Sequence, residues 1–121
     1  MRFVHTTAYT RDLDKTIDFY VNVMGLKVAR RFKTPDGKEI VFLDDGFGTN
    51  IEFIQCADGD APAVEKSPSW AFEPDDFDAM LKFIEDSDEF RVEAGPVEVP
   101  GARFFFFYDY NGIYIQIIEH K

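Results

Sequence analysis

The sequence contains a single cysteine, Cys56, among its 121 residues. One thiol cannot form a disulfide within the chain, and a zinc site built from paired cysteines needs more of them. The first five residues lack the apolar run of a signal peptide, and no apolar run approaches the roughly 20 residues that span a bilayer. A glycine-rich phosphate loop is also missing, which disfavours a nucleotide cofactor. The sequence therefore predicts a cytoplasmic protein with no membrane partner.

Positive charge is scarce as well. Lys and Arg total 13 against 23 Asp and Glu, which gives a formal net charge of −10. A negative field repels the phosphate backbone of nucleic acids and the surface of anionic membranes. We therefore expect no nucleic-acid partner, whereas neutral or cationic small molecules stay open as ligands.

Aromatic side chains are abundant by contrast. They make up 17% of the residues, fourteen of them Phe, within a hydrophobic content of 45%. This is ample material for a packed core, and it excludes disorder of the polar, aromatic-poor kind. A chain of this length has room for one compact domain, which we expect to span residues 1–121.

The chain contains an internal repeat. Residues 5–57 aligned on residues 69–121, at one constant offset and without a gap, give ten identities. The identical pairs are Asp12/Asp76, Asp14/Asp78, Phe19/Phe83, Val28/Val92, Gly37/Gly101, Phe42/Phe106, Asp45/Asp109, Gly48/Gly112, Ile51/Ile115 and Ile54/Ile118. Glycines recur where backbone geometry demands them. We interpret the chain as two copies of one module, residues 1–55 and 69–121, joined by a linker at 56–68.

Each copy has the pattern β-α-β-β-β, so the predicted fold class is α+β. Asp12 is placed to cap a helix with apolar residues at helical spacing, and Gly25 ends it. In the first copy the predicted strands are Arg2–Ala8, Lys27–Phe32, Ile40–Leu43 and Thr49–Gln55. In the second copy the helix runs from Asp75 or Asp76 to about Glu85, and the predicted strands are Trp70–Glu73, Phe90–Glu93, Arg103–Tyr108 and Ile113–Glu119.

Two such modules can pack with pseudo-twofold symmetry, so that their strands form one curved, eight-stranded cleft. A functional position in one half then has a counterpart at the aligned position of the other half. Glu52 lies between apolar residues of its strand and has the counterpart Gln116, while His5 in the first strand has the counterpart Ser69. A carboxylate in an apolar cleft needs a partner, and His, Glu and a Gln carbonyl are all ligands that a divalent cation accepts.

A plainer interpretation of Glu52 is a position in contact with water. Alternation along the strand directs Ile51 and Phe53 toward the core, and it places Asn50, Glu52 and Ile54 on the opposite face. The histidine of the first strand is likewise compatible with an ordinary strand position. The residues by themselves leave both interpretations open.

Several segments of both halves together carry a recognisable pattern: His5–Thr7, Asp12–Tyr20, Met24–Leu26, Asn50–Phe53, Ala71–Glu73 with Asp75 and Asp76, Tyr108–Gly112 and Ile115–Ile117. On these segments the chain resembles the vicinal oxygen chelate superfamily over nearly its whole length. That superfamily includes glyoxalase I (lactoylglutathione lyase), bleomycin-resistance proteins, extradiol dioxygenases and fosfomycin-resistance enzymes. The resemblance implies the fold, but one scaffold of this kind hosts many chemistries.

Metal-dependent members of this superfamily offer one ligand position on the first and on the last strand of each module. The resemblance places these positions at His5, Glu52, Ser69 and Gln116. His5 and Glu52 match the ligands usual in bacterial glyoxalase I, whereas Ser69 replaces a histidine and Gln116 replaces a glutamate. A hydroxyl is a poor substitute for imidazole, while an amide carbonyl can still bind a metal.

The resemblance thus implies a glyoxalase I-like lyase or isomerase with an altered metal site, acting on a small oxygenated substrate. A divalent ion (Zn, Ni, Mn or Fe) would polarise the substrate oxygens, and Glu52 would be the general base. Clefts of this superfamily are often completed across a dimer, so we expect a homodimer. Extradiol dioxygenases and fosfomycin-resistance enzymes fit less well, because both need a second histidine ligand.

A non-catalytic binder that resembles bleomycin-resistance proteins is the alternative. Such a protein holds a cationic or aromatic small molecule in an acidic, aromatic cleft at the dimer interface and needs no metal. Trp70, Tyr114 and the run Phe104–Phe107 suit this function, because aromatic faces attract cations. Core packing is the plainer interpretation of the run, since a strand buried on both faces has a continuous apolar sequence.

Overall fold

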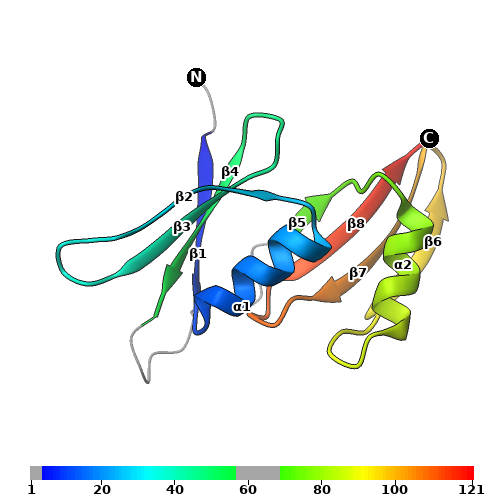
Figure 1. The fold of residues 1–121 in the computed structure, drawn as a ribbon. Coiled ribbons are helices and arrows are strands. Elements are labelled where there is room, and N and C mark those ends of the chain that lie inside the picture. Colours follow the sequence, from blue (N-terminus) through cyan, green and yellow to red (C-terminus); the bar gives the residue numbers. More distant parts are fainter. Residues whose placement is uncertain (1–3, 57–68) are drawn as a thin grey trace. The chain divides into compact units, whose positions relative to one another are not determined.

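The computed structural model (Figure 1) describes residues 4–56 and 69–121 and divides the chain into two compact units, Met1–Ala63 and Val64–Lys121. Each unit contains a four-stranded mixed sheet and one short α-helix, so the class is α+β as predicted. The predicted linker, apart from Cys56, lies outside the described residues. Neither α-helix within the described ranges is long and apolar enough to cross a membrane.

The sheet of unit 1 contains the strands β1 (His5–Thr10), β2 (Lys27–Lys33), β3 (Glu39–Asp44) and β4 (Asn50–Gln55). Their order across the sheet is β1-β4-β3-β2, with β1 parallel to β4 and the other neighbours antiparallel. The helix α1 (Leu13–Asp18) and the π-helical turn η1 (Phe19–Val23) lie between β1 and β2 in the chain. This order makes neighbours of β1 and β4, the two strands that contain the predicted site residues.

The helical segment of unit 1 begins and ends where the sequence predicts. Asp12 has an extended backbone, and its Oδ1 accepts a hydrogen bond of 3.0 Å from the backbone N–H of Lys15. This cap satisfies an N–H group that has no partner inside the helix. At the other end the chain turns at Gly25, whose φ of 79° lies in the region that favours glycine.

The core of unit 1 lies on one face of its sheet. Val41, Leu43 and Phe53 are completely buried, and the ring of Tyr20 from η1 lies 5.0 Å from the ring of Phe53. Ile51 is buried on the same face. The prediction that Ile51 and Phe53 face the core is therefore confirmed. Successive strand residues point to opposite faces, so the residues between these two point away from the helical segment.

The sheet of unit 2 contains the strands β5 (Ser69–Phe72), β6 (Ala94–Val99), β7 (Ala102–Tyr108) and β8 (Tyr114–His120). Their order is β5-β8-β7-β6, and β5 is parallel to β8. The helix α2 (Phe77–Asp86) lies between β5 and β6 in the chain. Unit 2 thus repeats the strand order of unit 1.

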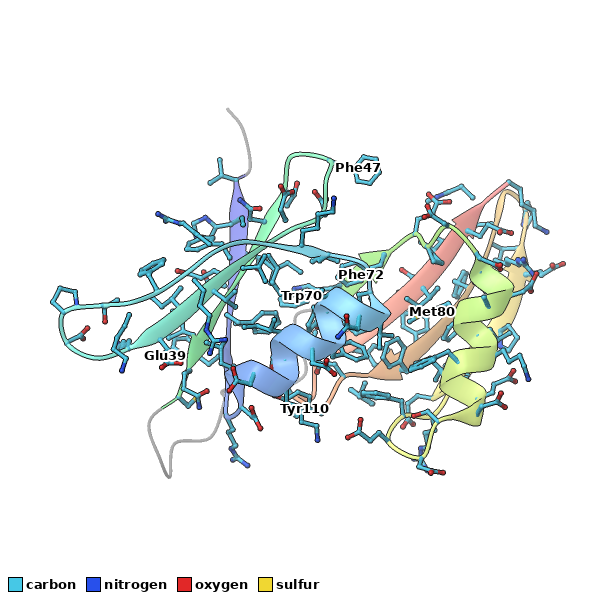
Figure 2. All side chains as sticks on the ribbon, in the orientation of Figure 1. Glu39, Phe47, Trp70, Phe72, Met80 and Tyr110 are labelled. Carbon is cyan, nitrogen blue, oxygen red and sulfur yellow. The ribbon has the colours of Figure 1, made fainter. Side chains whose placement is uncertain are left out.

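The core of unit 2 lies between α2 and its sheet. Phe105 and Phe107 of β7 are completely buried, and the ring of Phe77 meets Phe105 nearly edge-on with centroids 5.5 Å apart. Met80 points from α2 toward the sheet of this unit (Figure 2) and is 9% exposed. Burial of these aromatic side chains is the main stabilising contribution of the face, because apolar burial scales with the area removed from water.

The alignment of the two sequence repeats holds in the structure, which confirms the two tandem modules. The Cα partner of Glu52 on β3 is Phe42, and the Cα partner of Gln116 on β7 is Phe106. Asp76 caps α2 as its counterpart caps α1, by accepting a hydrogen bond of 3.0 Å from the N–H three residues on. The predicted cleft shared by both modules, with its pseudo-twofold symmetry, stays a prediction.

Two predicted strands differ in the structure. The strand predicted at Arg2–Ala8 continues to Thr10, and its first two residues lie outside the described residues. The strand predicted at Phe90–Glu93 is wrong, because β6 begins only after it. Gly95 and Pro96 imitate a turn in the sequence but lie inside this strand, beside a register irregularity at the edge of the sheet. Proline is tolerated there because an edge strand leaves one side of its backbone unpaired.

Candidate functional site

The predicted site residues of unit 1 share the sheet face that points away from its helical segment. Alternation places His5 and Thr7 of β1 there, beside Glu52 of β4. Phe42 is the Cα partner of Glu52, and Arg30 of β2 is the Cα partner of Phe42, so both lie on the same face. We call these five residues the site face of unit 1.

The structure brings His5 and Glu52 together. The Nε2 atom of His5 lies 3.8 Å from Oε1 of Glu52, which is too long for a hydrogen bond. Two ligands that each lie about 2.1 Å from one metal ion are separated by roughly 3 to 3.5 Å. The two side chains are 40% and 15% exposed. The pair can therefore converge on one small ligand with little movement.

Thr7 holds the carboxylate of Glu52. Its hydroxyl donates a hydrogen bond of 2.6 Å to Oε1, the oxygen nearest to His5. A hydroxyl-to-carboxylate bond of this length is short and charge-assisted, and it restricts the rotation of the carboxylate. Among the described residues Oε2 accepts no hydrogen bond. One oxygen of Glu52 is therefore held by the protein, and the other is available to a ligand or a proton.

Phe42 is the apolar centre of the site face. The ring of His5 meets it edge-on, with centroids 5.3 Å apart and an interplanar angle of 89°. The Arg30 guanidinium carbon lies 4.8 Å from the centroid of Phe42, and Phe32 stacks against Phe42 at 6.3 Å. One phenyl ring thus contacts both an imidazole and a guanidinium.

Gln116 has fewer polar neighbours in unit 2 than Glu52 has in unit 1. Its Cα partner on β5 is Ala71 and its partner on β7 is Phe106. Ala71 stands at the position of the second repeat that aligns with Thr7 in the first. A methyl group therefore replaces the hydroxyl that holds the carboxylate in unit 1.

Ser69, at the fourth predicted ligand position, begins β5 and is exposed. Its Cα partner on β8 is Tyr114. Its participation with Gln116 in one site together with His5 and Glu52 stays a prediction, as does the metal-binding role of all four.

Four rings adjoin one another on the face of unit 2 that contains Gln116, and we call them the aromatic face: Phe104, Phe106, Tyr114 and Tyr108. Their centroids are 5.8 Å apart for Phe104 and Phe106, and 4.7 Å apart for Phe106 and Tyr114, which stack at 10°. Tyr108 lies 4.7 Å from Tyr114 and is 48% exposed. Such a row of rings provides flat apolar surface to which a planar ligand can bind.

The run Phe104–Phe107 divides between the two faces of β7. Phe105 and Phe107 are buried in the core, as core packing predicts. Phe104 and Phe106 are partly exposed on the aromatic face. The interpretation of this run as a strand buried on both faces is therefore wrong for half of its residues, because α2 covers one face of the sheet.

The two residues singled out for the binding alternative lie on opposite faces. Tyr114 belongs to the aromatic face. Trp70 is the Cα partner of the completely buried Ile115, and so it lies on the core side of the sheet. Strand alternation directs Trp70 away from the aromatic face, so it does not share a surface with Tyr114, and its role in ligand binding stays a prediction.

The second histidine of the chain, His120, contacts a different carboxylate. Its backbone N–H donates a hydrogen bond of 2.9 Å to Oε2 of Glu73, and its Nδ1 lies 3.1 Å from Oε1. The backbone hydrogen bond and then the side-chain one lower the pKa of Glu73. No group of three or more His, Cys, Asp or Glu side chains within residues 4–56 and 69–121 is arranged to hold a metal ion.

Three residues of the site face were not among the ligand and catalytic positions predicted from the sequence. Thr7 follows His5 by two positions, and alternation alone places both on one face, so that signal was available. Phe42 also carried a signal, because its counterpart is identical in the repeat. Arg30 was visible as one of several basic residues that could bind an acidic substrate group, but its direction was not, because a register shift in β2 decides which way it points.

Comparison with known proteins agrees with this architecture. The model of the Glyoxalase/Bleomycin resistance protein/Dioxygenase superfamily matches residues 2–117. An uncharacterized protein of Bacillus subtilis, YwbC, is 30% identical over 98% of this chain and 97% of its own length. The lactoylglutathione lyase of Neisseria meningitidis is 28% identical over 100% of this chain and 92% of its own length.

Solved structures with the same fold have different functions. The trypanothione-dependent glyoxalase I of Leishmania major has a TM-score of 0.81 at 22% identity, covering 98% of this chain and 86% of its own. The fosfomycin resistance protein FosX of Listeria monocytogenes, complexed with Mn(II), has a TM-score of 0.73 at 19% identity, covering 99% and 93%. The antibiotic-binding protein TnmS3 of Streptomyces has a TM-score of 0.74 at 20% identity, covering 100% and 98%. These likenesses show the fold alone. By its matching family model and its two βαβββ modules, the chain belongs to the Glyoxalase/Bleomycin resistance protein/Dioxygenase superfamily, the group that its motifs predicted.

Proposed function

We propose that the protein is a lyase or isomerase of the glyoxalase I type, which moves a proton between adjacent carbons of a small oxygenated substrate. The observation that carries the proposal is the half-buried His5–Glu52 pair, with 3.8 Å between Nε2 and Oε1. The lactoylglutathione lyase relative, 28% identical over the whole chain, adds support.

Glu52 is the general base in this proposal. Thr7 holds Oε1, while Oε2 accepts no hydrogen bond from the described residues and can take the proton. A base that is already oriented needs no rotation before proton transfer. Positioned general bases contribute about 10²- to 10⁴-fold to the rate.

His5, Glu52 and Gln116 would hold a divalent ion, with Ser69 at the fourth position of the set. The donor chemistry fits, because imidazole nitrogen, carboxylate oxygen and amide oxygen are all ligands of zinc, nickel, manganese or iron. The bound ion would supply Lewis-acid polarisation of the substrate oxygens. Gln116 cannot accept a proton, which leaves Glu52 as the carboxylate of the set.

A homodimer is part of the same proposal. The set contains two strong ligands, His5 and Glu52, and members of the superfamily often complete their clefts with a second chain. Light scattering on the purified protein measures this directly, and a monomer at all concentrations would contradict it.

Metal analysis combined with turnover tests the proposed activity. Protein dialysed against excess zinc, nickel, manganese or iron should retain about one ion per site and convert the hemithioacetal of methylglyoxal and glutathione to lactoylglutathione, or isomerise a related small oxygenated compound. Glu52→Gln keeps the shape of the side chain and should weaken retention of the ion, and it should lower turnover by about 10²- to 10⁴-fold, because an amide can bind a metal but cannot act as a base. Glu85→Gln, on the exposed surface of α2, removes the same charge and is the matched control.

Two results contradict the proposal. The first is a protein that retains no divalent ion under any of these conditions. The second is turnover that responds equally to Glu52→Gln and Glu85→Gln, because the effect would then follow from net charge and not from a base at the site.

Sequestration of a planar or cationic small molecule is the second candidate function. The aromatic face favours it, since Phe106 and Tyr114 stack at 4.7 Å and Tyr108 is half exposed. With bleomycin as the probe, Tyr114→Ala should weaken binding by about tenfold. Phe83→Ala on α2 removes a ring that is 47% exposed and should leave binding unchanged. Binding that survives Tyr114→Ala rejects this candidate.

A further inference from the structure

The arginines of the two sheets differ in their partners. Arg31 lies 2.8 Å from a carboxylate oxygen of Asp14, and Arg103 lies 3.0 Å from one of Asp78. These hydrogen bonds raise the pKa of both guanidinium groups. Arg30, next to Arg31 on β2, contacts no carboxylate among residues 4–56 and 69–121. Its charge is therefore not neutralised by the described protein.

Arg30 lies over two phenyl rings instead. Its guanidinium carbon is 4.9 Å from the centroid of Phe32 and 4.8 Å from that of Phe42. A cation–π contact uses the face of the guanidinium and leaves the N–H donors at its edge for other partners. Phe42 also contacts His5, so one ring separates Arg30 from the proposed reaction site.

A β-bulge brings Arg30 to this face. Val28 pairs with Leu43 and Arg30 pairs with Phe42, so Ala29 is an extra residue in β2. Without the extra residue, alternation would direct Arg30 to the core side of the sheet. Bulges are frequent beside functional sites, where they change the direction of a side chain.

Unit 2 provides an internal comparison for this position. Ala94 is the repeat counterpart of Arg30, and its Cα partner is Phe106. Its strand also has a register irregularity, between Ala94 and Val97. A register irregularity thus lies before Arg30 in unit 1 and after Ala94 in unit 2, and both residues pair with a phenylalanine, but unit 1 has a guanidinium where unit 2 has a methyl group.

The negative charge of the chain falls mainly on unit 2. Residues 4–56 contain seven Lys or Arg and eight Asp or Glu, whereas residues 69–121 contain four and twelve. An anion that approaches the site face meets a unit close to neutral. The net charge of the whole chain is therefore a poor guide to the ligand of this face.

We propose, building on the proposed function, that the substrate is a small oxygenated carboxylic acid whose carboxylate binds Arg30. The guanidinium offers parallel N–H donors that match the two oxygens of a carboxylate. The carboxylate then lies beside Phe42, and the carbons that exchange the proton lie at His5 and Glu52. Arg30 is a specificity-determining residue in this arrangement.

NMR of the arginine Nε–H signals tests the subsite without any turnover. Lactate is the carboxylate probe, and lactamide is its neutral counterpart. We expect a saturable shift of the Arg30 signal with lactate and none with lactamide. Arg30→Gln should weaken lactate binding by about tenfold or more, the loss expected for hydrogen bonds to a charged group. Arg30→Lys keeps the charge without the paired donors and should give an intermediate loss.

Arg11→Gln is the matched control, because it removes the same charge from an exposed arginine outside the site face. Lactate binding should be unchanged in this variant. An equal loss in Arg11→Gln and Arg30→Gln overturns the proposal, and so does a shift that never saturates or that lactamide reproduces.

Failure of the subsite and failure of the proposed function give different results. Saturable lactate binding at Arg30 in a protein that binds no divalent ion and shows no turnover rejects the function and keeps the subsite. A metal-binding, active protein in which lactate leaves the Arg30 signal unchanged keeps the function and rejects the subsite.

Discussion

The site face of unit 1 and the aromatic face of unit 2 occupy equivalent positions in two copies of one fold, yet their chemistry differs. Phe42 and Phe106 occupy the same place in the register of the two sheets. Around them, four polar side chains of unit 1 correspond to smaller or neutral ones in unit 2. The pairs are His5/Ser69, Thr7/Ala71, Arg30/Ala94 and Glu52/Gln116.

The comparison shows which positions of the fold are free to change. Phe53 and Ile117 correspond to each other and are both buried, because the core face must exclude water in each unit. The opposite face carries no such requirement, and substitutions there cost little stability. One half of a duplicated protein can therefore carry the reactive groups while the other half provides apolar surface.

The ion pairs of the two units also combine a position that is kept with a position that changes. Asp14 of α1 and Asp78 of α2 are identical in the repeat, and each binds an arginine of its own sheet. The arginine is Arg31 of β2 in unit 1 and Arg103 of β7 in unit 2. The contact between helix and sheet is kept, although different strands supply the cation.

Glu52→Gln should have the largest effect, because it makes unit 1 match unit 2 at the reactive position. We expect turnover to fall by about 10²- to 10⁴-fold, since an amide cannot act as a base. Steady-state kinetics measures this, and unchanged thermal unfolding shows that the fold is intact. If activity persists, the difference between the two faces is not catalytic.

Substitutions in the two cores should have large and similar effects. Phe53→Ala and Phe105→Ala each remove a completely buried ring and should lower the free energy of unfolding by about 3–5 kcal/mol. Phe47→Ala, at a ring that is 93% exposed in the turn between β3 and β4 (Figure 2), should change it by less than about 0.5 kcal/mol. Urea denaturation measures all three, and unequal losses for the two core variants would show that the cores are not equivalent.

Thr7→Val should have an intermediate effect. It places an apolar side chain beside Glu52, as Ala71 lies beside Gln116 in unit 2. Loss of a hydroxyl bonded to a carboxylate costs about 1.5–3 kcal/mol, so kcat and metal affinity should each fall by about tenfold or more. Thr7→Ser restores the donor and should restore both. Equal activity of the Val and Ser variants would show that the hydrogen bond plays no part in positioning Glu52.

Glu73→Gln should have the smallest effect and should depend on pH. The contacts from His120 lower the pKa of Glu73 below its ordinary value of 4.5. A carboxyl whose pKa is lower in the folded state adds stability above its unfolded pKa, and this addition is lost as pH falls through the folded value. The group is exposed, so we expect a slight difference in urea midpoint between the variant and wild type at pH 7 that diminishes as the pH falls below 4.5. A difference that is constant across this range would exclude the carboxyl as its source.

Local signals account for the parts of the fold that the sequence predicted. Asp12 and Asp76 are helix caps whose partners lie three residues away, and this short range makes them recognisable. The strand β6 was missed for the opposite reason. Gly95 and Pro96 are turn residues by composition, and their place in an edge strand depends on pairing with β7.

The candidate site was predicted only in part, because some of its residues give local signals and others depend on contacts between distant strands. His5 and Glu52 were identified because polar residues in apolar strands are visible in the sequence, and the strand pairing brings them together. The contacts of Phe42 with His5 and Arg30 depend on side-chain packing, which composition does not show. The direction of Trp70 followed from pairing with Ile115, which placed it on the core side of the sheet and not on the aromatic face.

The sequence by itself determined that the chain contains two βαβββ modules, because caps, turns and alternation are local signals and recur at a constant offset along the chain. Only the tertiary structure decided that the hydroxyl of Thr7 holds Glu52 and that Arg30 lies on the same face as His5. Both arrangements involve strands that are distant in the sequence, and both depend on register. One extra residue in β2 reverses the direction of Arg30, and no local pattern reports that residue.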